Sequence, residues 1–379
     1  MVTKMFDYNL LGVGSVIYIY LTACFALLIF NFAYMSRTSI GIRIGMHRIL
    51  YWLDEILQLH CVVDAGDHIK KDRAIQKHVK KMSKQLTNVS KLVAYSQTLA
   101  LIEAKYKHID LHSYLSENYE MFQSLGLKYK RKSSIERAYY ADFIRRLPPC
   151  RSECKPLFDI LVSYMENSTV YCRENVLCAL SSLGSVEAIE NGLKLINDKK
   201  WFHHHKLISD CLAIFSGDKE KLAAVLWDKY KQWDTALMLA VVEFITTCSL
   251  DYRKIFLPIL QDPGTDLEIR IAILRYYRKC IYHPAHSALL ECLADDDNDN
   301  DIKMKIVAVS ALMEYPSRET TDALISAVSS PVWYVRSNAS SALVYMQTPE
   351  SRLAGILNSE DRFAREILRY RLEYENKVS

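Results

Sequence analysis

A pattern that returns about every 32 residues restricts the fold of this chain more than any other feature of its sequence. A basic residue is followed by a small or apolar residue three positions later and by an apolar or small pair at positions six and seven. Arg336, Ala339, Ala342 and Leu343 form one copy. The copies begin at Arg137, Arg173, Lys206, Met238, Arg270, Lys305, Arg336 and Arg365, at intervals of 29 to 36 residues, and Met238 replaces the basic residue in its copy. A period of this length indicates a repeat architecture, in which each copy is one supersecondary unit.

Each copy is predicted to be a helical hairpin, because the three- and seven-residue spacing puts the apolar side chains on one helix face. Second amphipathic stretches alternate with the first, at residues 186–196, 219–231, 252–260, 286–293, 320–328 and 350–357. Glycine and proline are scarce, at 11 and 9 of 379 residues, which favours helices joined by short turns. We therefore expect an all-α superhelix whose stacked hairpins share one core. The basic residue of each copy is expected to pair with an acid or a carbonyl of a neighbouring repeat.

The ten residues from Tyr334 to Leu343, YVRSNASSAL, are nearly the consensus of a known repeat. The chain thus resembles the HEAT-repeat superfamily, especially its short bacterial PBS-lyase HEAT-like type. The resemblance covers about two-thirds of the chain, residues 133–377, and implies a solenoid whose second helices line a concave surface. It also favours a bacterial source. Because this fold serves many partners, the resemblance does not assign a function.

The N-terminal region, residues 1–36, is predicted to be a transmembrane anchor. There is no charged residue between Asp7 and Arg37, and the stretch from Gly12 to Met35 is dominated by apolar and aromatic residues. At about 1.5 Å per residue, this helix is longer than the roughly 30 Å hydrocarbon core of a bilayer. We expect residues 10–35 to form a single membrane-spanning helix ahead of the solenoid.

Basic residues on either side of the span predict its orientation. Arg37, Arg43 and Arg48 follow the span, whereas only Lys4 precedes it. Since Lys and Arg near a span favour the cytosolic side, we expect a single-pass protein of the cell membrane with a cytosolic C-terminal domain. The ten cysteines contain no CxxC pair and are expected to be reduced thiols, mostly buried.

Residues 37–132 are predicted to be a helical juxtamembrane region, followed by the repeats at 133–379. Apolar residues recur at helical spacing between positions 40 and 63, and this helix either lies on the inner leaflet or packs on the following domain. A basic run follows, formed by Lys70, Lys71, Arg73, Lys77, Lys80, Lys81 and Lys84. It predicts contact with anionic lipid or an acidic partner, and the alternative is a solvated helix face. Nucleic acid is disfavoured, because no aromatic platform accompanies the run and the net charge is only +4.

Residues that could contact a protein partner are predicted at the concave face of the solenoid. Aromatic side chains dominate interface hot spots, and the sequence groups Trp227, Lys229, Tyr230, Lys231 and Trp233 near the end of one second helix. Packing inside the repeat is the alternative role of the three aromatic residues.

The sequence predicts no catalytic residue, metal ligand set or cofactor. It contains no P-loop, GxGxxG, GxSxG or HExxH motif. Adjacent residues of a helix point about 100° apart, so His203, His204 and His205 are not expected to converge on one metal ion. The acidic run at 295–301 has Asn300 and Ile306 where a calcium-binding EF-hand needs Gly and Glu.

These observations favour a membrane-anchored scaffold that binds and positions or regulates a protein partner. A membrane-embedded envelope enzyme such as a glycosyltransferase, or a transporter, is the partner we expect. Two other functions stay open: an enzyme or enzyme cofactor of the HEAT-like lyase type, and an adaptor for anionic lipid or nucleic acid through the basic run.

Overall fold

The computed structural model describes residues 2–64, 68–149, 154–294 and 299–378, and all regular structure in these ranges is helical. Within them, side chains are not described at 2–17, 19, 31–40, 62, 64, 68–69, 299–301 and 374–378. The helices confirm the predicted all-α class and are consistent with a helical repeat solenoid. The chain divides into two compact units, Met1–Cys150 and Arg151–Ser379.

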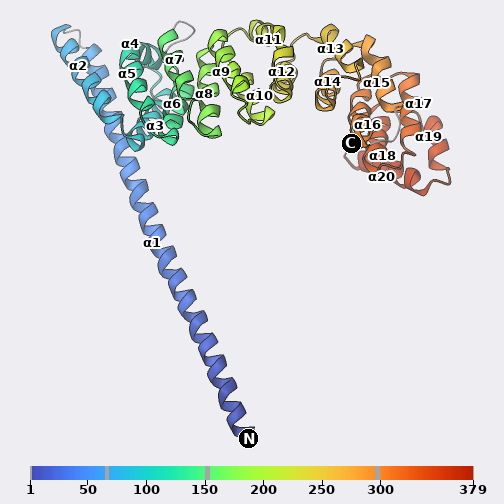
Figure 1. The fold of residues 1–379 in the computed structure, drawn as a ribbon, viewed down its shortest axis with the longest axis horizontal. Helices are drawn as coiled ribbons and strands as arrows, with labels where there is room; N and C mark the ends of the chain where they lie inside the picture. Colours follow the sequence, from blue (N-terminus) through green and yellow to red (C-terminus); the bar gives the residue numbers. More distant parts are fainter. Residues whose placement is uncertain (1, 65–67, 150–153, 295–298, 379) are drawn as a thin grey trace. The chain divides into compact units, whose positions relative to one another are not determined.

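The first unit is organised around one long helix, α1 (Val2–Asp64) (Figure 1). The C-terminal part of α1 packs on α2 and α3, and α6 packs on α3 and α5. The other helices of this unit are α2 (His68–Gln85), α3 (Val89–Lys105), α4 (Leu111–Glu117), α5 (Tyr119–Lys130) and α6 (Ser134–Arg146). The first predicted repeat helix, which carries Arg137, is therefore α6.

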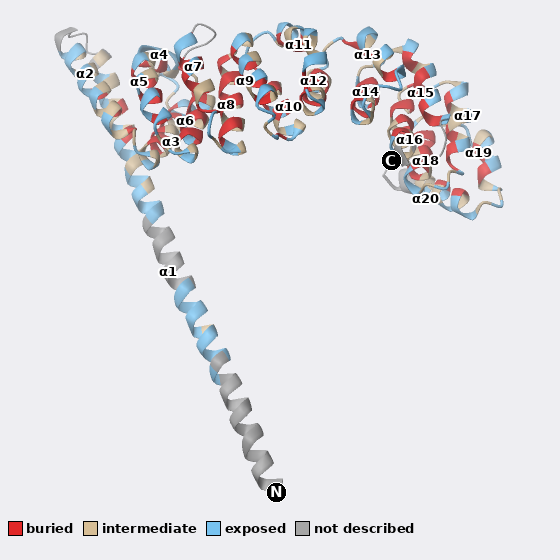
Figure 2. Ribbon diagram, viewed as in Figure 1, coloured by how far each residue is buried: buried red, intermediate tan, exposed pale blue. Residues whose placement is uncertain are grey.

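Most of α1 between residues 18 and 30 is exposed (Figure 2). Large apolar side chains are exposed on all sides of the helix there. The exposed side chains include Tyr18, Tyr20, Leu21, Phe25, Leu28 and Ile29. Among the side chains that the structure describes, no helix offers an apolar stretch long enough to cross a bilayer. The predicted span at 12–35 lies partly outside them, because the side chains of 12–17, 19 and 31–35 are not described.

The second unit is a series of helical hairpins in two layers (Figure 1). One layer contains the first helices of the hairpins, which are the even-numbered helices from α8 to α20, and they stack on one another in chain order. The other layer contains the second helices, among which α7, α9 and α11 form one stack and α13, α15 and α17 form another. The bounds are α7 (Lys155–Ser163), α8 (Val170–Leu183), α9 (Val186–Asp198), α10 (His205–Ala213), α11 (Lys219–Asp228), α12 (Thr235–Thr247), α13 (Arg253–Gln261), α14 (Leu267–Lys279), α15 (His286–Ala294), α16 (Asp299–Leu312), α17 (Arg318–Ala327), α18 (Trp333–Tyr345), α19 (Glu350–Leu357) and α20 (Arg362–Val378). Each predicted second stretch is found as a helix, α9, α11, α13, α15, α17 or α19.

In three copies, the basic residue connects its hairpin to the one before it. Arg336 donates to the carbonyl oxygens of Ser330 and Pro331, at 2.7 and 2.9 Å. Arg365 donates to Ser359 at 2.6 Å, and Arg270 to Leu260 at 3.0 Å. These acceptors lie at or just beyond the C-terminal ends of the preceding second helices, where carbonyl groups lack an intrahelical partner. The expected pairing with a carbonyl of a neighbouring repeat is confirmed at these positions.

A disulfide joins neighbouring repeats, between Cys178 of α8 and Cys211 of α10. Cys154 is also disulfide-bonded. The expectation that the cysteines are reduced thiols is therefore wrong for these residues. The two cysteines pair because they occupy the same position of neighbouring copies, five residues beyond Arg173 and five beyond Lys206, on stacked helices.

Candidate functional site

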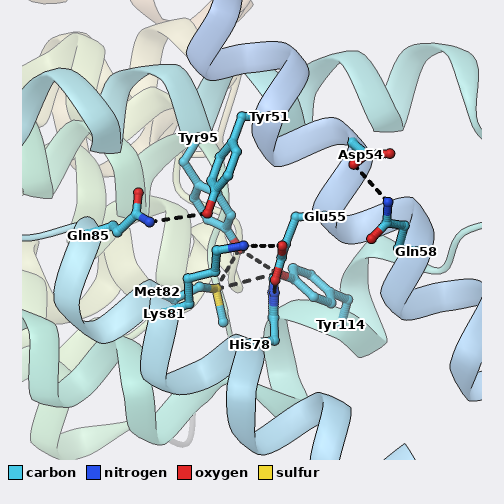
Figure 3. A network of polar contacts seen from close by, with 10 residues as sticks. All are labelled: Tyr51, Asp54, Glu55, Gln58, His78, Lys81, Met82, Gln85, Tyr95 and Tyr114. Carbon is cyan, nitrogen blue, oxygen red and sulfur yellow. Dashed lines mark hydrogen bonds and ion pairs between the residues drawn. The ribbon is translucent and has the colours of Figure 1, made fainter.

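A buried polar network fastens α1 to the rest of the first unit (Figure 3). Glu55 of α1 forms an ion pair with Lys81 of α2, and its other carboxylate oxygen lies 3.4 Å from Nδ1 of His78. The helices meet here because Glu55 is flanked by two buried apolar residues, Trp52 and Ile56, which turn this face of α1 inward. A carboxylate on such a face needs partners, since an unpaired charge is costly to bury.

The network continues through two tyrosines from other helices (Figure 3). The Tyr114 hydroxyl of α4 lies 2.7 Å from Nε2 of His78, and the Tyr95 hydroxyl of α3 lies 2.6 Å from that of Tyr114. One consistent set of donors satisfies these contacts: Tyr95 donates to Tyr114, Tyr114 donates to Nε2, and the Nδ1 proton of His78 faces Glu55. In this set the histidine is neutral, and both of its ring nitrogens are engaged.

Burial and pairing set the protonation states of the network. Burial lowers the pKa of His78 below 6.5, despite the opposing effect of Glu55. Burial by itself raises the pKa of Glu55, but the hydrogen bonds from Lys81 and His78 outweigh this effect, and the net shift is downward. Burial also raises the pKa of Tyr114. At neutral pH the network thus holds one carboxylate, one ammonium, a neutral imidazole and neutral phenols.

The contacts around the network fix α2 antiparallel to α1. Gln85, at the end of α2, donates to the Tyr51 hydroxyl at 3.2 Å, whereas Ile75, earlier in α2, lines a pocket together with Leu59 and Val63 of α1. Of the two interpretations of residues 40–63, packing on the following domain is therefore correct around Trp52 and Ile56. Nearer the predicted span, the side chains of Ile42, Met46 and Leu50 remain exposed.

A pocket of about 220 Å³ lies beside the network. Its apolar lining comes from Ile56, Leu59, Val63, Ile75 and Ile109, and its polar lining includes His78 and Tyr114. The raised pKa of Tyr114 keeps this phenol neutral, so it is not a nucleophile at neutral pH. Both nitrogens of His78 are already engaged. The arrangement is a junction that holds α1, α2, α3 and α4 together.

The basic run lies on α2, and the structure divides it into two sets. Lys81 is turned inward to Glu55, and Lys71 is half-buried. Lys70, Arg73, Lys77, Lys80 and Lys84 are exposed. Sequence reasoning treated all seven as one surface, because the partner of Lys81 is 26 residues away in the chain.

Two further lysines that the sequence analysis did not single out belong to this region. Lys128 of α5 donates to the Ser83 carbonyl at 3.0 Å, and Lys132 donates to the Thr87 carbonyl. Both ammonium groups therefore satisfy carbonyls at the C-terminal end of α2, where the helix dipole favours positive charge. Their four-residue spacing, with the aromatic Tyr129 between them, was a usable signal in the sequence.

The predicted partner-binding residues lie at the end of α11, and most of them make contacts within the unit. Trp233 is buried, and its indole nitrogen donates to the Leu226 carbonyl at 2.9 Å. Trp227 is half-buried and stacks on Tyr230, with ring centroids 4.7 Å apart. Lys229 forms an ion pair with Glu190, and Lys231 is exposed.

The nearby exposed aromatic residue that sequence reasoning missed is Phe202, with 80% of its surface accessible. It precedes α10 and lines a depression of about 500 Å³ together with Trp201 and Trp233. Its position at the junction of two repeats carried no periodic signal. Whether the predicted cluster contacts a partner stays a prediction.

The three consecutive histidines have separate partners in the structure. His203 accepts from Nε of Arg173 at 3.1 Å, His204 caps the start of α10, and His205 lies 3.0 Å from a carboxylate oxygen of Glu243. Within the described part of the chain, no group of three or more His, Cys, Asp or Glu side chains is placed to hold a metal ion. Part of the acidic run, residues 295–298, lies outside the described residues.

Comparison with known proteins finds no matching family model and no matching curated protein. The resemblance to HEAT repeats therefore rests on the sequence period and on the hairpins described above.

Proposed function

We propose that this chain is a membrane-anchored scaffold of the HEAT-repeat type, which binds a protein partner and positions or regulates it. One observation carries the proposal: a single helix, α1, joins an exposed apolar stretch at 18–30 to the buried junction at Trp52, Glu55 and Ile56. A helix that is apolar around its circumference belongs in a protein core or in a bilayer. We assign residues 10–35 to the bilayer and the helical units to its cytosolic side, since Arg43 and Arg48 follow the span.

A binding role is supported by the kind of surface that the second unit exposes. Large aromatic side chains lie open at the starts of first helices, including Tyr171, Phe202, Trp333, Tyr334 and Phe363. Exposed aromatic residues are typical anchors of protein interfaces. Tethering raises the effective concentration of such a surface toward other membrane proteins. A membrane-embedded glycosyltransferase or a transporter is therefore the partner class that we propose, and we assign the chain no catalytic activity.

Affinity purification tests this function. The full-length chain and a copy lacking residues 1–36 are purified from gently solubilised native membranes, and co-purifying proteins are identified by mass spectrometry. We expect an integral membrane protein to accompany the full-length chain and to be depleted with the anchorless copy. Recovery of the full-length chain in the soluble fraction, or of the chain without any specific companion, would contradict the proposal.

A further inference from the structure

We propose that one face of α2 is the docking surface for an acidic helix of the protein partner. The face consists of Arg73, Lys77, Lys80 and Lys84 and is called here the α2 stripe. This inference rests on the proposed function and deepens it, because it states the chemistry of the partner and where on the chain the partner binds.

The α2 stripe is formed by intervals of three and four residues, so its four side chains follow one side of the helix. All four are exposed, and within the described part of the chain none of them forms a side-chain hydrogen bond or an ion pair. Lys81 shows the contrast, because it lies on another side of the same helix and pairs with Glu55. The junction thus uses one lysine of α2 and leaves the stripe available to another molecule.

The stripe is not explained by the stability of α2 itself. Like charges three or four residues apart destabilise a helix by about 0.2–0.5 kcal/mol per pair. The nearby Lys128 adds positive charge at the end of the same helix, whereas Lys132 is paired with Glu136 at 2.9 Å. The exposed acid of α2 within the described residues is Asp72. An arrangement of this kind gains favourable interactions when it meets a negatively charged surface.

The direction of α2 argues against the bilayer as that surface. Lys84 is next to Gln85, whose side chain donates a hydrogen bond to the Tyr51 hydroxyl of α1. Tyr51 lies 16 residues beyond Met35, the end of the proposed span. At about 1.5 Å per residue, this places Lys84 about 24 Å from the end of the span, or about 18 Å for a helix tilted by about 40°. Because α2 is antiparallel to α1, Lys80, Lys77 and Arg73 lie successively farther away. Screening acts over about 8 Å at physiological ionic strength, so the charge of lipid headgroups is weak at these distances.

The spacing of the charges matches an acidic helix. Neighbouring stripe residues are separated by about 4.5–6 Å along the axis of α2, and carboxylates at intervals of three and four residues on a partner helix have the same separation. Flanking charges on paired helices set partner choice in this way. No stripe position is aromatic, so the stripe lacks the stacking platform that single-stranded nucleic acid prefers.

Site-specific photocrosslinking tests the inference in the full-length chain in native membranes. The crosslinker p-benzoylphenylalanine replaces Gln76, which is exposed beside the stripe. We expect an adduct with a membrane-associated protein, at a peptide that carries Asp or Glu at intervals of three and four residues. Reversal of the stripe by R73E, K77E, K80E and K84E should lower the adduct yield about tenfold or more, because each exposed ion pair contributes about a factor of two to five.

A matched control reverses four exposed lysines of the second unit, Lys194, Lys199, Lys221 and Lys254, and should leave the yield unchanged. Circular dichroism checks that both variants keep their helix content. As a rescue, replacing the acidic residues of the crosslinked partner peptide by lysine should restore the adduct with the reversed stripe. Adducts with phospholipid, nuclease-sensitive adducts, or equal yields from both variants would overturn the inference. If the partner still co-purifies with the reversed stripe, the scaffold function stands and the docking site is wrong. If wild-type chain co-purifies with no partner, the scaffold function itself fails.

Discussion

Replacing Glu55 by Gln should loosen α1 from α2 while keeping the shape of the side chain. The change removes the carboxylate that pairs with Lys81 and faces His78. Hydrogen bonds to charged groups contribute about 1.5–3 kcal/mol. Glu55 and Lys81 are 20% and 27% exposed, so water replaces part of what is lost. We expect a loss of about 1–2 kcal/mol in the free energy of opening α2, or about a fivefold to thirtyfold faster exchange of its amide hydrogens.

Hydrogen–deuterium exchange of the full-length chain in detergent measures this change on peptides from α2. Asp54→Asn is the matched control, because Asp54 is the neighbouring carboxylate on α1 and bonds the side chain of Gln58, at 2.8 Å, on the exposed side of the helix. The control should leave the exchange of α2 unchanged. Wild-type exchange in Glu55→Gln, or equal acceleration in Asp54→Asn, would refute the role assigned to the network.

Three further predictions concern pH and the repeat. Since the pKa of His78 is lowered below 6.5 and that of Glu55 below 4.5, the unfolded chain binds more protons in acid. The stabilisation by His78 is present above pH 6.5 and lost below it, so α2 amides should be less protected at pH 5.5 than at 7.5 after correction for intrinsic exchange rates. Gly184→Ala should lower the free energy of unfolding by about 1–2 kcal/mol, because φ is +76° there and a Cβ atom would lie 3.1 Å from the Gly217 nitrogen. The control is Gly355→Ala, where a Cβ atom would have no neighbour within 4 Å, and it should not lower the melting temperature. Arg336→Ala should lower the free energy of unfolding by about 1.5–3 kcal/mol, because the carbonyls of Ser330 and Pro331 lose their charged donor. Thermal melting measures this loss.

The helices could be predicted from the sequence because their signal is local. The spacing of apolar residues fixes which side of a helix faces inward, and it repeats in every hairpin. The bounds of α19 agree with the prediction at both ends, Glu350 and Leu357. The role of the repeated arginine was also accessible, since a basic side chain in the first turns of a helix is near the carbonyls that end the previous one.

The buried junction could not be predicted, because its members are far apart in the chain. His78 and Glu55 are separated by 23 residues, and Tyr114 and His78 by 36. One weak signal was present: Glu55 interrupts the apolar face that Trp52 and Ile56 define, and a carboxylate in such a place requires a partner. The Trp233 indole shows the same limit, since nothing local indicates that it turns back to the Leu226 carbonyl.

The disulfide between Cys178 and Cys211 and the charges beside α1 favour opposite compartments. Lasting disulfides belong to oxidising compartments, whereas Arg43 and Arg48 after the span favour the cytosol. The stacking of α8 on α10 brings the two thiols together, and this stacking depends on apolar contacts of residues such as Val176, Leu180 and Leu212. The contact can therefore persist when the bond is reduced, and the charges alone determine the orientation that we propose. Alkylation of both thiols in cells quenched with acid would agree with a cytosolic second unit, and an intact bond under those conditions would place it on the other side of the membrane.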